Sequence, residues 1–170
     1  MGKALLVIDL QNDYFPEGKF PLWNTDVSLT TVERAIARAR EKGVPVIIVQ
    51  HIISNPSKAP FFKEGSSGVE VHPRVLAAAP DAPIVVKSFA DSFVKTTLEQ
   101  TLTALGATEL LVCGMMTQNC VTHTAISKSA EKYDVTVLAD ACTTVNEILH
   151  VIALNALSTR VRLQPVDEAL

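Results

Sequence analysis

The sequence predicts an α/β fold, namely a Rossmann-like, doubly wound sheet of about six mainly parallel strands with helices on both faces, in a three-layer α/β/α arrangement. Two observations support this prediction. Short, almost continuously apolar runs recur along the chain, as strands buried on both faces require. Segments with helical periodicity separate most of these runs, and strand–helix alternation builds a parallel sheet through right-handed crossovers. The 170 residues fit a single domain spanning residues 1–170.

The expected elements follow in order along the chain. Buried apolar runs predict strands at Ala4–Asp9, Val44–Gln50, Ile84–Lys87, Leu110–Cys113, Val135–Ala139 and Arg160–Leu163. The 3.6-residue pattern predicts helices at Val27–Lys42, Ser92–Leu105, Asn119–Lys132 and Asn146–Leu157. Gly43 and Gly106 follow the first two helices, where glycine commonly ends a helix. Residues 52–83 are rich in Pro, Gly and Ser and lack periodicity, which predicts a long functional or lid-like loop.

Composition and charge exclude several classes of protein. A hydrophobic content of 48% with 19% charged residues is typical of a globular chain. The net charge of −3 gives no excess of positive charge for binding nucleic acid or an anionic membrane. No apolar run approaches the roughly 20 residues that span a bilayer, and the N-terminus passes straight into a strand without a signal-peptide pattern. Three widely spaced cysteines without a Cys-x-x-Cys pair favour a reducing, cytoplasmic setting over disulfides or structural zinc.

Polar residues at the strand ends are the candidate functional groups, because ligands bind outside the carboxyl ends of parallel strands. Asp9 and Lys87 end two of the strands, and Cys120 follows the turn that starts at Gly114. A thiol in the first turn of a helix is favoured as thiolate by the helix dipole and unpaired N–H groups, which also stabilise an oxyanion. A desolvated Asp9 can take the proton, and Lys87 can hold Asp9 and favour the thiolate. The pattern predicts covalent catalysis by cysteine.

Three segments resemble the isochorismatase-like cysteine hydrolase family, and the resemblance covers nearly the whole chain. The segments are Asp9-Leu-Gln-Asn-Asp-Tyr-Phe, Val86-Lys87-Ser-Phe with Ser92-Phe93, and Gly114-Met-Met-Thr-Gln-Asn-Cys120-Val121 with Thr124-Ala125. The resemblance implies an Asp9–Lys87–Cys120 triad and a cis peptide between Met115 and Met116. That bond would turn the Met116 N–H toward an oxyanion, beside the N–H of Cys120, while Thr117 holds the turn. It also implies a homo-oligomer whose subunits contribute to each other's sites.

Departures from the family pattern narrow the expected activity. Relatives that act on nicotinamide resemble one another in a metal-binding Asp-x-His after the second strand, whereas this chain reads Gln50-His51-Ile52-Ile53. We therefore expect neither a nicotinamidase nor a metal or other cofactor. The cysteine favours C–N hydrolysis of a small amide, carbamoyl or ureido substrate. Vinyl-ether hydrolysis of the isochorismatase type and a catalytically silent binding role stay open as alternatives.

Further side chains are candidates for substrate binding. They are Asn12, Phe15, His51, Phe61 and Phe93. Phe61-Phe62 stands in a polar loop and is expected to cover substrate or a neighbouring subunit rather than pack within the chain. His123 lies three residues after Cys120 and is a rival base, although side chains on a helix tilt toward its N-terminus and so favour Asp9. Cys113 and Cys142 are expected to pack, the first in a strand and the second after one.

Two other classes with a doubly wound sheet fit poorly. A dinucleotide-binding enzyme needs Gly-x-Gly-x-x-Gly after the first strand, and this chain has no glycine there until Gly18. A phosphoacceptor signalling domain needs an aspartate at the end of the third strand, where Lys87-Ser88 stands. Neither class explains Cys120.

Overall fold

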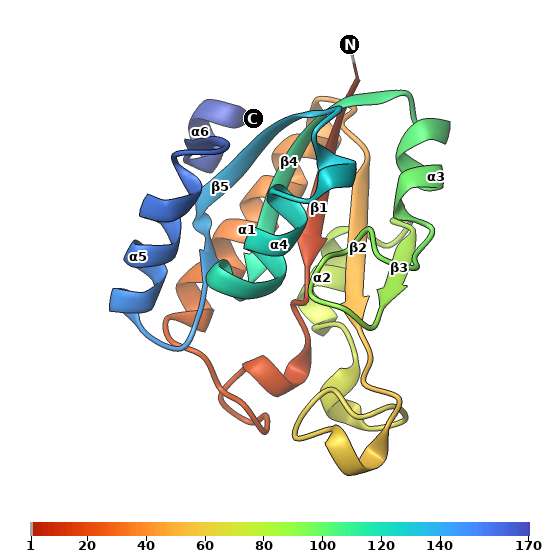
Figure 1. Ribbon diagram of the computed structural model, residues 1–170, viewed down its shortest axis with the longest axis vertical. Helices are drawn as coiled ribbons and strands as arrows, with labels where there is room; N and C mark the ends of the chain where they lie inside the picture. Colours follow the sequence, from red (N-terminus) through yellow and green to blue (C-terminus); the bar gives the residue numbers. More distant parts are fainter. Residues whose placement is uncertain (1) are drawn as a thin grey trace.

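The computed structural model describes residues 2–170 and confirms the predicted fold class. Parallel strands form one six-stranded sheet in the order β3-β2-β1-β4-β5-β6, and the strands labelled in Figure 1, β1 to β5, run in the same direction there. The strands are β1 (Gly2–Ile8), β2 (Val46–His51), β3 (Ile84–Lys87), β4 (Ala107–Met115), β5 (Asp134–Thr143) and β6 (Arg162–Gln164). The chain order reverses between β1 and β4, so the carboxyl ends of these strands form the crevice where such sheets bind ligands.

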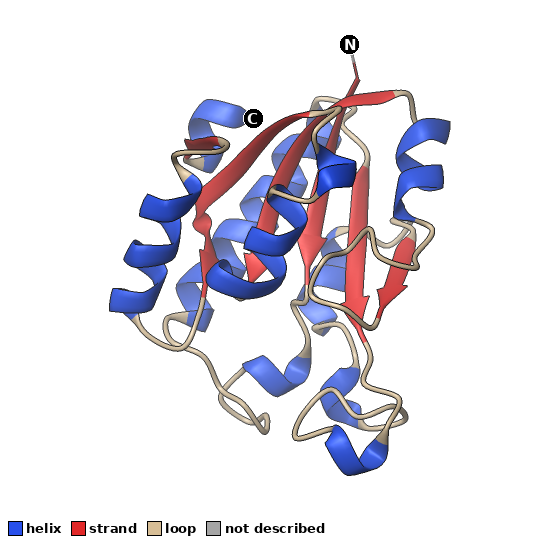
Figure 2. Ribbon diagram, in the orientation of Figure 1, coloured by secondary structure: helices blue, strands red, loops and turns tan. Residues whose placement is uncertain are grey.

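Helices cover both faces of the sheet (Figures 1 and 2). The α-helices are α1 (Thr25–Glu41), α2 (Pro73–Ala78), α3 (Leu98–Ala104), α4 (Thr122–Ala125), α5 (Glu147–Leu157) and α6 (Val166–Ala169). Short turns of 3-10 helix are η1 (Asn12–Tyr14), η2 (Pro56–Lys58), η3 (Ser67–Val69) and η5 (Lys128–Ala130), and η4 (Thr117–Val121) is a π-helical turn. Within residues 2–170, no helix has both the length and the hydropathy to cross a membrane.

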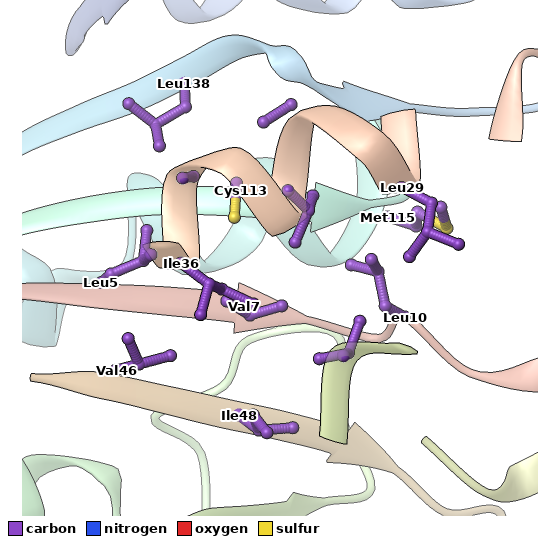
Figure 3. Close-up of a cluster of buried hydrophobic side chains, with 14 of the residues drawn as sticks. Leu5, Val7, Leu10, Leu29, Ile36, Val46, Ile48, Cys113, Met115 and Leu138 are labelled. Atoms are coloured by element: carbon purple, nitrogen blue, oxygen red, sulfur yellow. The ribbon is translucent and has the colours of Figure 1, made fainter. Parts of the chain in front are cut away.

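Two apolar cores lie on opposite faces of the sheet. Leu5 and Val7 of β1 face α1, whose Ile36 packs on them (Figure 3). Leu6 and Ile8 belong to the other core, together with α3 and α4. Successive strand residues point to opposite faces, so a strand covered on both sides must be apolar at every position. This is why the strands were visible as continuous apolar runs.

The end of β4 bends toward the end of β1. The pairing of β4 with β5 shifts register between Val112 and Gly114, which then pairs with Cys142. Gly114 has a φ of 123°, and a Cβ atom there would lie 2.0 Å from the carbonyl oxygen of Ile8. Only glycine allows this approach. The close contact brings the turn that carries Cys120 against the strand end that carries Asp9.

Two predicted helices are shorter than expected. The first, Ser92–Leu105, contains regular helix only in α3. Ser92 donates its N–H to Thr124 Oγ1 at 3.0 Å, and Thr96 Oγ1 donates to the Ser92 carbonyl. The second, Asn119–Lys132, is divided into η4, α4 and η5, and the Ser127 side chain caps the last of these. Hydroxyl groups that bond nearby backbone compete with helix in both places.

The helices Val27–Lys42 and Asn146–Leu157 are close to their predictions. α1 begins two residues earlier, and the Asn146 side chain accepts the Leu149 N–H at 2.8 Å as the N-cap of α5. Strands β4 and β5 extend beyond their predicted bounds at both ends, and on the carboxyl side Gly114 and Met115 of β4 pair with Cys142 and Thr143 of β5.

The loop 52–83 is mostly irregular, as predicted, but it contains α2. His72 caps this helix through Nδ1, which accepts the Arg74 N–H, and Pro73 occupies its first position. The buried carboxylate of Asp13 holds the loop against the segment after β1. It accepts the N–H of Phe62 at 2.7 Å and that of Lys19 at 3.1 Å.

Candidate active site

Three buried polar side chains meet at the carboxyl edge of the sheet. Asp9 follows β1, Lys87 ends β3, and Cys120 lies in the turn after β4. The Nζ of Lys87 lies 3.1 Å from Asp9 Oδ2 and 3.2 Å from Cys120 Sγ. The three residues are exposed by only 0%, 1% and 2%. Residues separated by up to 111 positions in sequence (9 to 120) therefore form one compact cluster.

Asp9 is placed by an unusual backbone conformation. Its φ of 56° lies in the left-handed region, which aspartate tolerates better than most residues. Its N–H donates to Val49 O at 3.0 Å, and its carbonyl accepts the Gln11 N–H at 2.9 Å. Neither carboxylate oxygen receives a hydrogen bond of good geometry from the described residues, despite the close ammonium of Lys87. The carboxylate is thus available to accept a proton.

Lys87 has four polar neighbours around its ammonium group. Besides Asp9 and Cys120, its Nζ lies 3.0 Å from the Phe89 carbonyl oxygen, to which it donates, and 2.7 Å from His51 Nδ1. His51 was predicted as a substrate-binding residue, and the structure brings it into this cluster. Burial and the positive charge of Lys87 lower the pKa of His51, while Asp9 acts in the opposite direction.

Cys120 is a buried thiol rather than the thiolate that the sequence led us to expect. Burial raises the pKa of Cys120 well above its usual range, and the Asp9 carboxylate raises it further, whereas Lys87 lowers it. The expectation that the resting site favours thiolate is therefore wrong. Cys120 lies inside η4 and ahead of a four-residue α4, so no long helix dipole offsets its desolvation. Proton removal must come from a neighbouring base.

The turn before Cys120 is tightly held. The peptide bond between Met115 and Met116 is cis. Thr117 is fully buried, and its Oγ1 lies 2.8 Å from His150 Nδ1 on α5. Its carbonyl accepts the Thr122 hydroxyl at 2.6 Å. The sequence did not indicate His150, because a lone histidine on an apolar helix carries no pattern.

The rival nucleophiles and the rival base lie elsewhere. His123 is exposed on α4. Cys113 and Cys142 are both buried, and their Sγ atoms donate weakly to the carbonyls of Leu6 and Leu138 at 3.5 and 3.3 Å. Burial raises the pKa of both thiols, that of Cys142 to about 12. Both cysteines pack, as expected, but Cys142 lies within β5 rather than after a strand.

Asn12 and Phe15 line a cavity of about 760 Å³ between the segment after β1, the 52–83 loop and α1. Asn12 donates from Nδ2 to the Ser67 carbonyl at 2.9 Å, and Phe15 packs on the His72 ring with centroids 4.3 Å apart. Among the described residues, Asp9, Lys87 and Cys120 do not line this cavity.

The phenylalanines expected to face substrate pack within the chain. Phe62 is 1% exposed, and its ring centroid lies 4.5 Å from that of Tyr14. The Phe61 ring is 4.8 Å from Phe20. The expectation that Phe61-Phe62 covers substrate or a second subunit is wrong for Phe62, because η1 supplies the aromatic partner that the sequence did not locate. Phe93 is buried and stacks on Tyr133 at 6.3 Å.

Gln11 is a site residue that the sequence analysis missed. Its Nε2 donates to the carbonyls of His51 and Val69 at 2.8 and 2.7 Å, and its Oε1 accepts the His51 N–H at 2.8 Å. The side chain is fully buried. A polar residue two places after the strand-end Asp9 was the available signal.

The cluster also has the donor atoms of a metal site, but it does not fit a metal ion well. Ligand atoms of Asp9, His51 and Cys120 lie within 4.8 Å of one another. The Nζ of Lys87 lies within 3.2 Å of each of those residues, so the cationic position is already taken by an ammonium. A metal ion and the Lys87 ammonium would repel each other strongly in this buried position.

Comparisons with known proteins show which family the chain resembles along most of its length. Residues 3–164 match the family model described as the isochorismatase domain. The chain is 40% identical over 144 residues to the isochorismatase family protein YddQ of Bacillus subtilis, covering 85% of this chain and 79% of that protein. It is 30% identical over 164 residues to a protein of Arabidopsis thaliana named "Probable inactive nicotinamidase", covering 86% of this chain and 83% of that one.

The fold is similar to solved structures as well. A protein of Oleispira antarctica, named for the isochorismatase hydrolases, superposes with a TM-score of 0.88 at 33% identity, covering 99% of this chain and 95% of that one. Other relatives bear the names nicotinamidase and streptothricin hydrolase. The match over nearly the whole chain shows that this protein belongs to the isochorismatase family, whose members are typically hydrolases.

Proposed function

We propose that this protein is a cysteine-dependent hydrolase that cleaves the C–N bond of an amide, carbamoyl or ureido substrate through a thioester on Cys120. One observation carries the proposal: the Nζ of Lys87 lies 3.1 Å from Asp9 Oδ2 and 3.2 Å from Cys120 Sγ inside a buried cluster. A nucleophile, a base and a cation that orients both are the parts that acyl transfer requires.

Acylation begins with proton transfer from the Cys120 thiol to the Asp9 carboxylate. The sulfur then attacks the substrate carbonyl carbon, and the π electrons move to oxygen. The backbone N–H groups of Met116 and Cys120 are the proposed donors to this oxyanion. When the tetrahedral intermediate collapses, the C–N bond breaks, and the nitrogen leaves as ammonia or an amine with the proton from Asp9.

Deacylation uses the same groups with water as the nucleophile. Asp9, now a carboxylate again, takes a proton from water, and the oxygen attacks the thioester carbon. The C–S bond breaks, the acid is released, and Cys120 regains its proton. Lys87 stabilises the negative charge on Asp9 and on sulfur in both halves of the reaction. No step needs a cofactor.

Two observations support C–N cleavage over other reactions. Cys120 stands beside a base that can protonate a leaving nitrogen. Relatives named nicotinamidase and streptothricin hydrolase are similar over 72% to 86% of the chain. The family name favours one second candidate, the vinyl-ether hydrolysis of an isochorismatase, for which Asp9 would act as an acid and Cys120 would be dispensable.

A substrate screen with ammonia detection tests the proposal. Amides, carbamoyl compounds and ureido acids are supplied to wild type, to Cys120→Ala and to Cys142→Ala as a matched control. We expect ammonia release from wild type and from Cys142→Ala, and none from Cys120→Ala. Turnover that survives in Cys120→Ala contradicts the covalent route. Vinyl-ether cleavage by both wild type and Cys120→Ala, with no ammonia from any substrate, supports the second candidate. Absence of both reactions supports a silent binding protein.

The homo-oligomer stays a prediction. Helix α5 adjoins the site through His150 and carries large apolar side chains that are well exposed, Ile148 by 74%, Val151 by 57% and Ile152 by 60%. Such a patch is unusual on a monomer, and a second copy of the chain would cover it. Sedimentation equilibrium of the full chain, with Ile152→Glu as the disrupting variant, measures this directly.

A further inference from the structure

His51 is the one member of the buried cluster that reaches solvent. Its side chain is 15% exposed, whereas those of Asp9 and Lys87 are 0% exposed. Asp9, Lys87 and Cys120 already have roles in the proposed reaction, but His51 has none. Its Nδ1 nevertheless lies 2.7 Å from Lys87 Nζ, the shortest of the four contacts of that ammonium.

The sheet and Gln11 together fix the position of His51. His51 and Lys87 are register partners in the parallel pair of β2 and β3, so their side chains lie side by side on one face. The Gln11 side chain bonds both the N–H and the carbonyl of His51. A backbone held on both sides leaves the imidazole little freedom other than rotation about its own side-chain bonds.

The hydrogen bond between His51 and Lys87 has one possible direction when the lysine is charged. An ammonium group has three donors and no acceptor, so His51 Nδ1 must accept. The ring proton of neutral histidine then lies on Nε2. Burial and Lys87 both lower the pKa of His51, which keeps the ring in this neutral, accepting form.

The count of donors shows what this contact does. Two of the three N–H bonds of the Lys87 ammonium are taken by His51 Nδ1 and the Phe89 carbonyl. The third is donated to Cys120 Sγ at 3.2 Å, and Asp9 Oδ2 lies 3.1 Å from the same nitrogen as an ion-pair partner. Without His51 the ammonium could rotate and turn a second N–H toward Asp9, or withdraw from the sulfur.

We infer that His51 is a positioning residue, which orients the Lys87 ammonium through Nδ1 so that its remaining N–H serves the Asp9–Cys120 pair. This inference rests on the proposed function for its catalytic consequence, but its effect on Cys120 is independent of any substrate. His51 does not act as the base, because its Nδ1 is engaged by Lys87.

An isosteric pair of variants isolates the accepting atom. His51→Asn places Oδ1 on Cγ, as histidine places Nδ1, and so keeps an acceptor for Lys87. His51→Leu places a methyl group there. The first measurement is the rate of carbamidomethylation of Cys120 by iodoacetamide at pH 8, located by peptide mass analysis. Melting temperatures of both variants, compared with wild type, show whether either variant has lost its fold.

We expect His51→Leu to react at Cys120 about tenfold more slowly, since losing the oriented cation shifts a thiol pKa by about one unit or more. His51→Asn should stay within about threefold of wild type, and the slow reaction of His51→Leu should resemble that of Lys87→Met. A merely structural or steric role of the ring would affect the two isosteric variants to the same extent. Equal alkylation rates in the Asn and Leu variants at unchanged melting temperature therefore overturn the inference.

Turnover provides the second measurement once a substrate is known. The inference predicts a lower kcat in His51→Leu with KM nearly unchanged, and recovery of kcat in His51→Asn. A rise in KM alone assigns His51 to substrate binding instead and contradicts the positioning role. Failure of the proposed hydrolysis would remove this second test but would leave the alkylation result standing, so the two failures are distinguishable.

Discussion

The ammonium of Lys87 lies 3.2 Å from the sulfur of Cys120, although Lys87 ends β3 near one edge of the sheet and Cys120 follows β4 on the other side of β1. Asp9, which follows β1, occupies the space between these strand ends and lies 3.1 Å from the same ammonium. The parallel sheet therefore assembles nucleophile, cation and base by bringing three strand ends together. The thiol pKa in this cluster is raised by burial, so the base and the cation decide when the sulfur reacts.

Asp9→Asn should move alkylation and turnover in opposite directions. The negative charge of Asp9 raises the pKa of Cys120, so removing it favours thiolate and should speed iodoacetamide labelling of Cys120 about tenfold at pH 7 to 8. Loss of the base should lower kcat by about 10²- to 10⁴-fold. Peptide-resolved labelling and ammonia release measure the two effects on one preparation. A parallel fall of both quantities would mean that Asp9 mainly maintains the fold.

Alkaline conditions should destabilise the protein through its buried thiols. Burial raises the pKa of Cys142 from about 9 in the unfolded chain to about 12 in the fold. Because the pKa is higher in the folded state, the thiol's contribution to the free energy of unfolding is complete below pH 9. This contribution is lost as the pH rises from 9 toward 12, at up to about 1.4 kcal/mol per pH unit for each thiol. Urea unfolding at pH 8, 9, 10 and 11 measures this loss. Cys142→Ala should show a shallower decline, and an identical slope would exclude Cys142 as a contributor.

Gly114→Ala should disrupt the approach of β4 to β1. The new Cβ would lie 2.0 Å from the Ile8 carbonyl oxygen, at a φ of 123°. Strain of this kind costs about 1–3 kcal/mol before the clash is counted, so the melting temperature should fall by about 5 °C or more. Gly43→Ala is the matched control, since Gly43 also has a positive φ of 67° but, within residues 2–170, no atom within 4 Å of the added Cβ. Similar losses in the two variants would show that the contact with Ile8 is unimportant.

Asp13→Ala should loosen the 52–83 loop. The buried N–H of Phe62 would lose its acceptor, at a cost of about 1–3 kcal/mol, and the N–H of Lys19 would lose one as well. Limited proteolysis should then cut within residues 52–83 at least several times faster than in wild type. Asp13→Asn keeps an acceptor oxygen and should fall between the two. Unchanged cleavage in Asp13→Ala would show that aromatic packing of Phe62 holds the loop without this carboxylate.

The sheet and its strand-end residues were predictable from sequence because their signals are local. Continuous apolar runs identify buried parallel strands, and the polar residue that ends each run then falls at a known edge. Asp9, Lys87 and Cys120 were found in this way, and the whole β3 range was correct. Helix ends were less predictable where Thr and Ser side chains bond the backbone, as at Ser92 and Ser127.

Properties that depend on burial could not be predicted from local pattern. The position of Cys120 suggested a thiolate, yet burial reverses the direction of its pKa shift. Likewise, Phe62 looked unpartnered until η1 placed Tyr14 against it, and nothing in the sequence indicated the contact between His51 and Lys87 that the β2–β3 pairing creates. Each of these outcomes depends on which segments distant in sequence come together.

Partition of the acyl group between water and hydroxylamine tests the central claim, the thioester on Cys120, most directly. With an amide substrate from the screen, wild type and Cys120→Ala are supplied with increasing hydroxylamine, and acid, hydroxamate and ammonia are measured. The account predicts that wild type forms hydroxamate in proportion to hydroxylamine, with one ammonia per acyl group transferred, and that Cys120→Ala forms none. Release of free acid alone at every hydroxylamine concentration, while ammonia appears at the normal rate, would contradict a thioester intermediate.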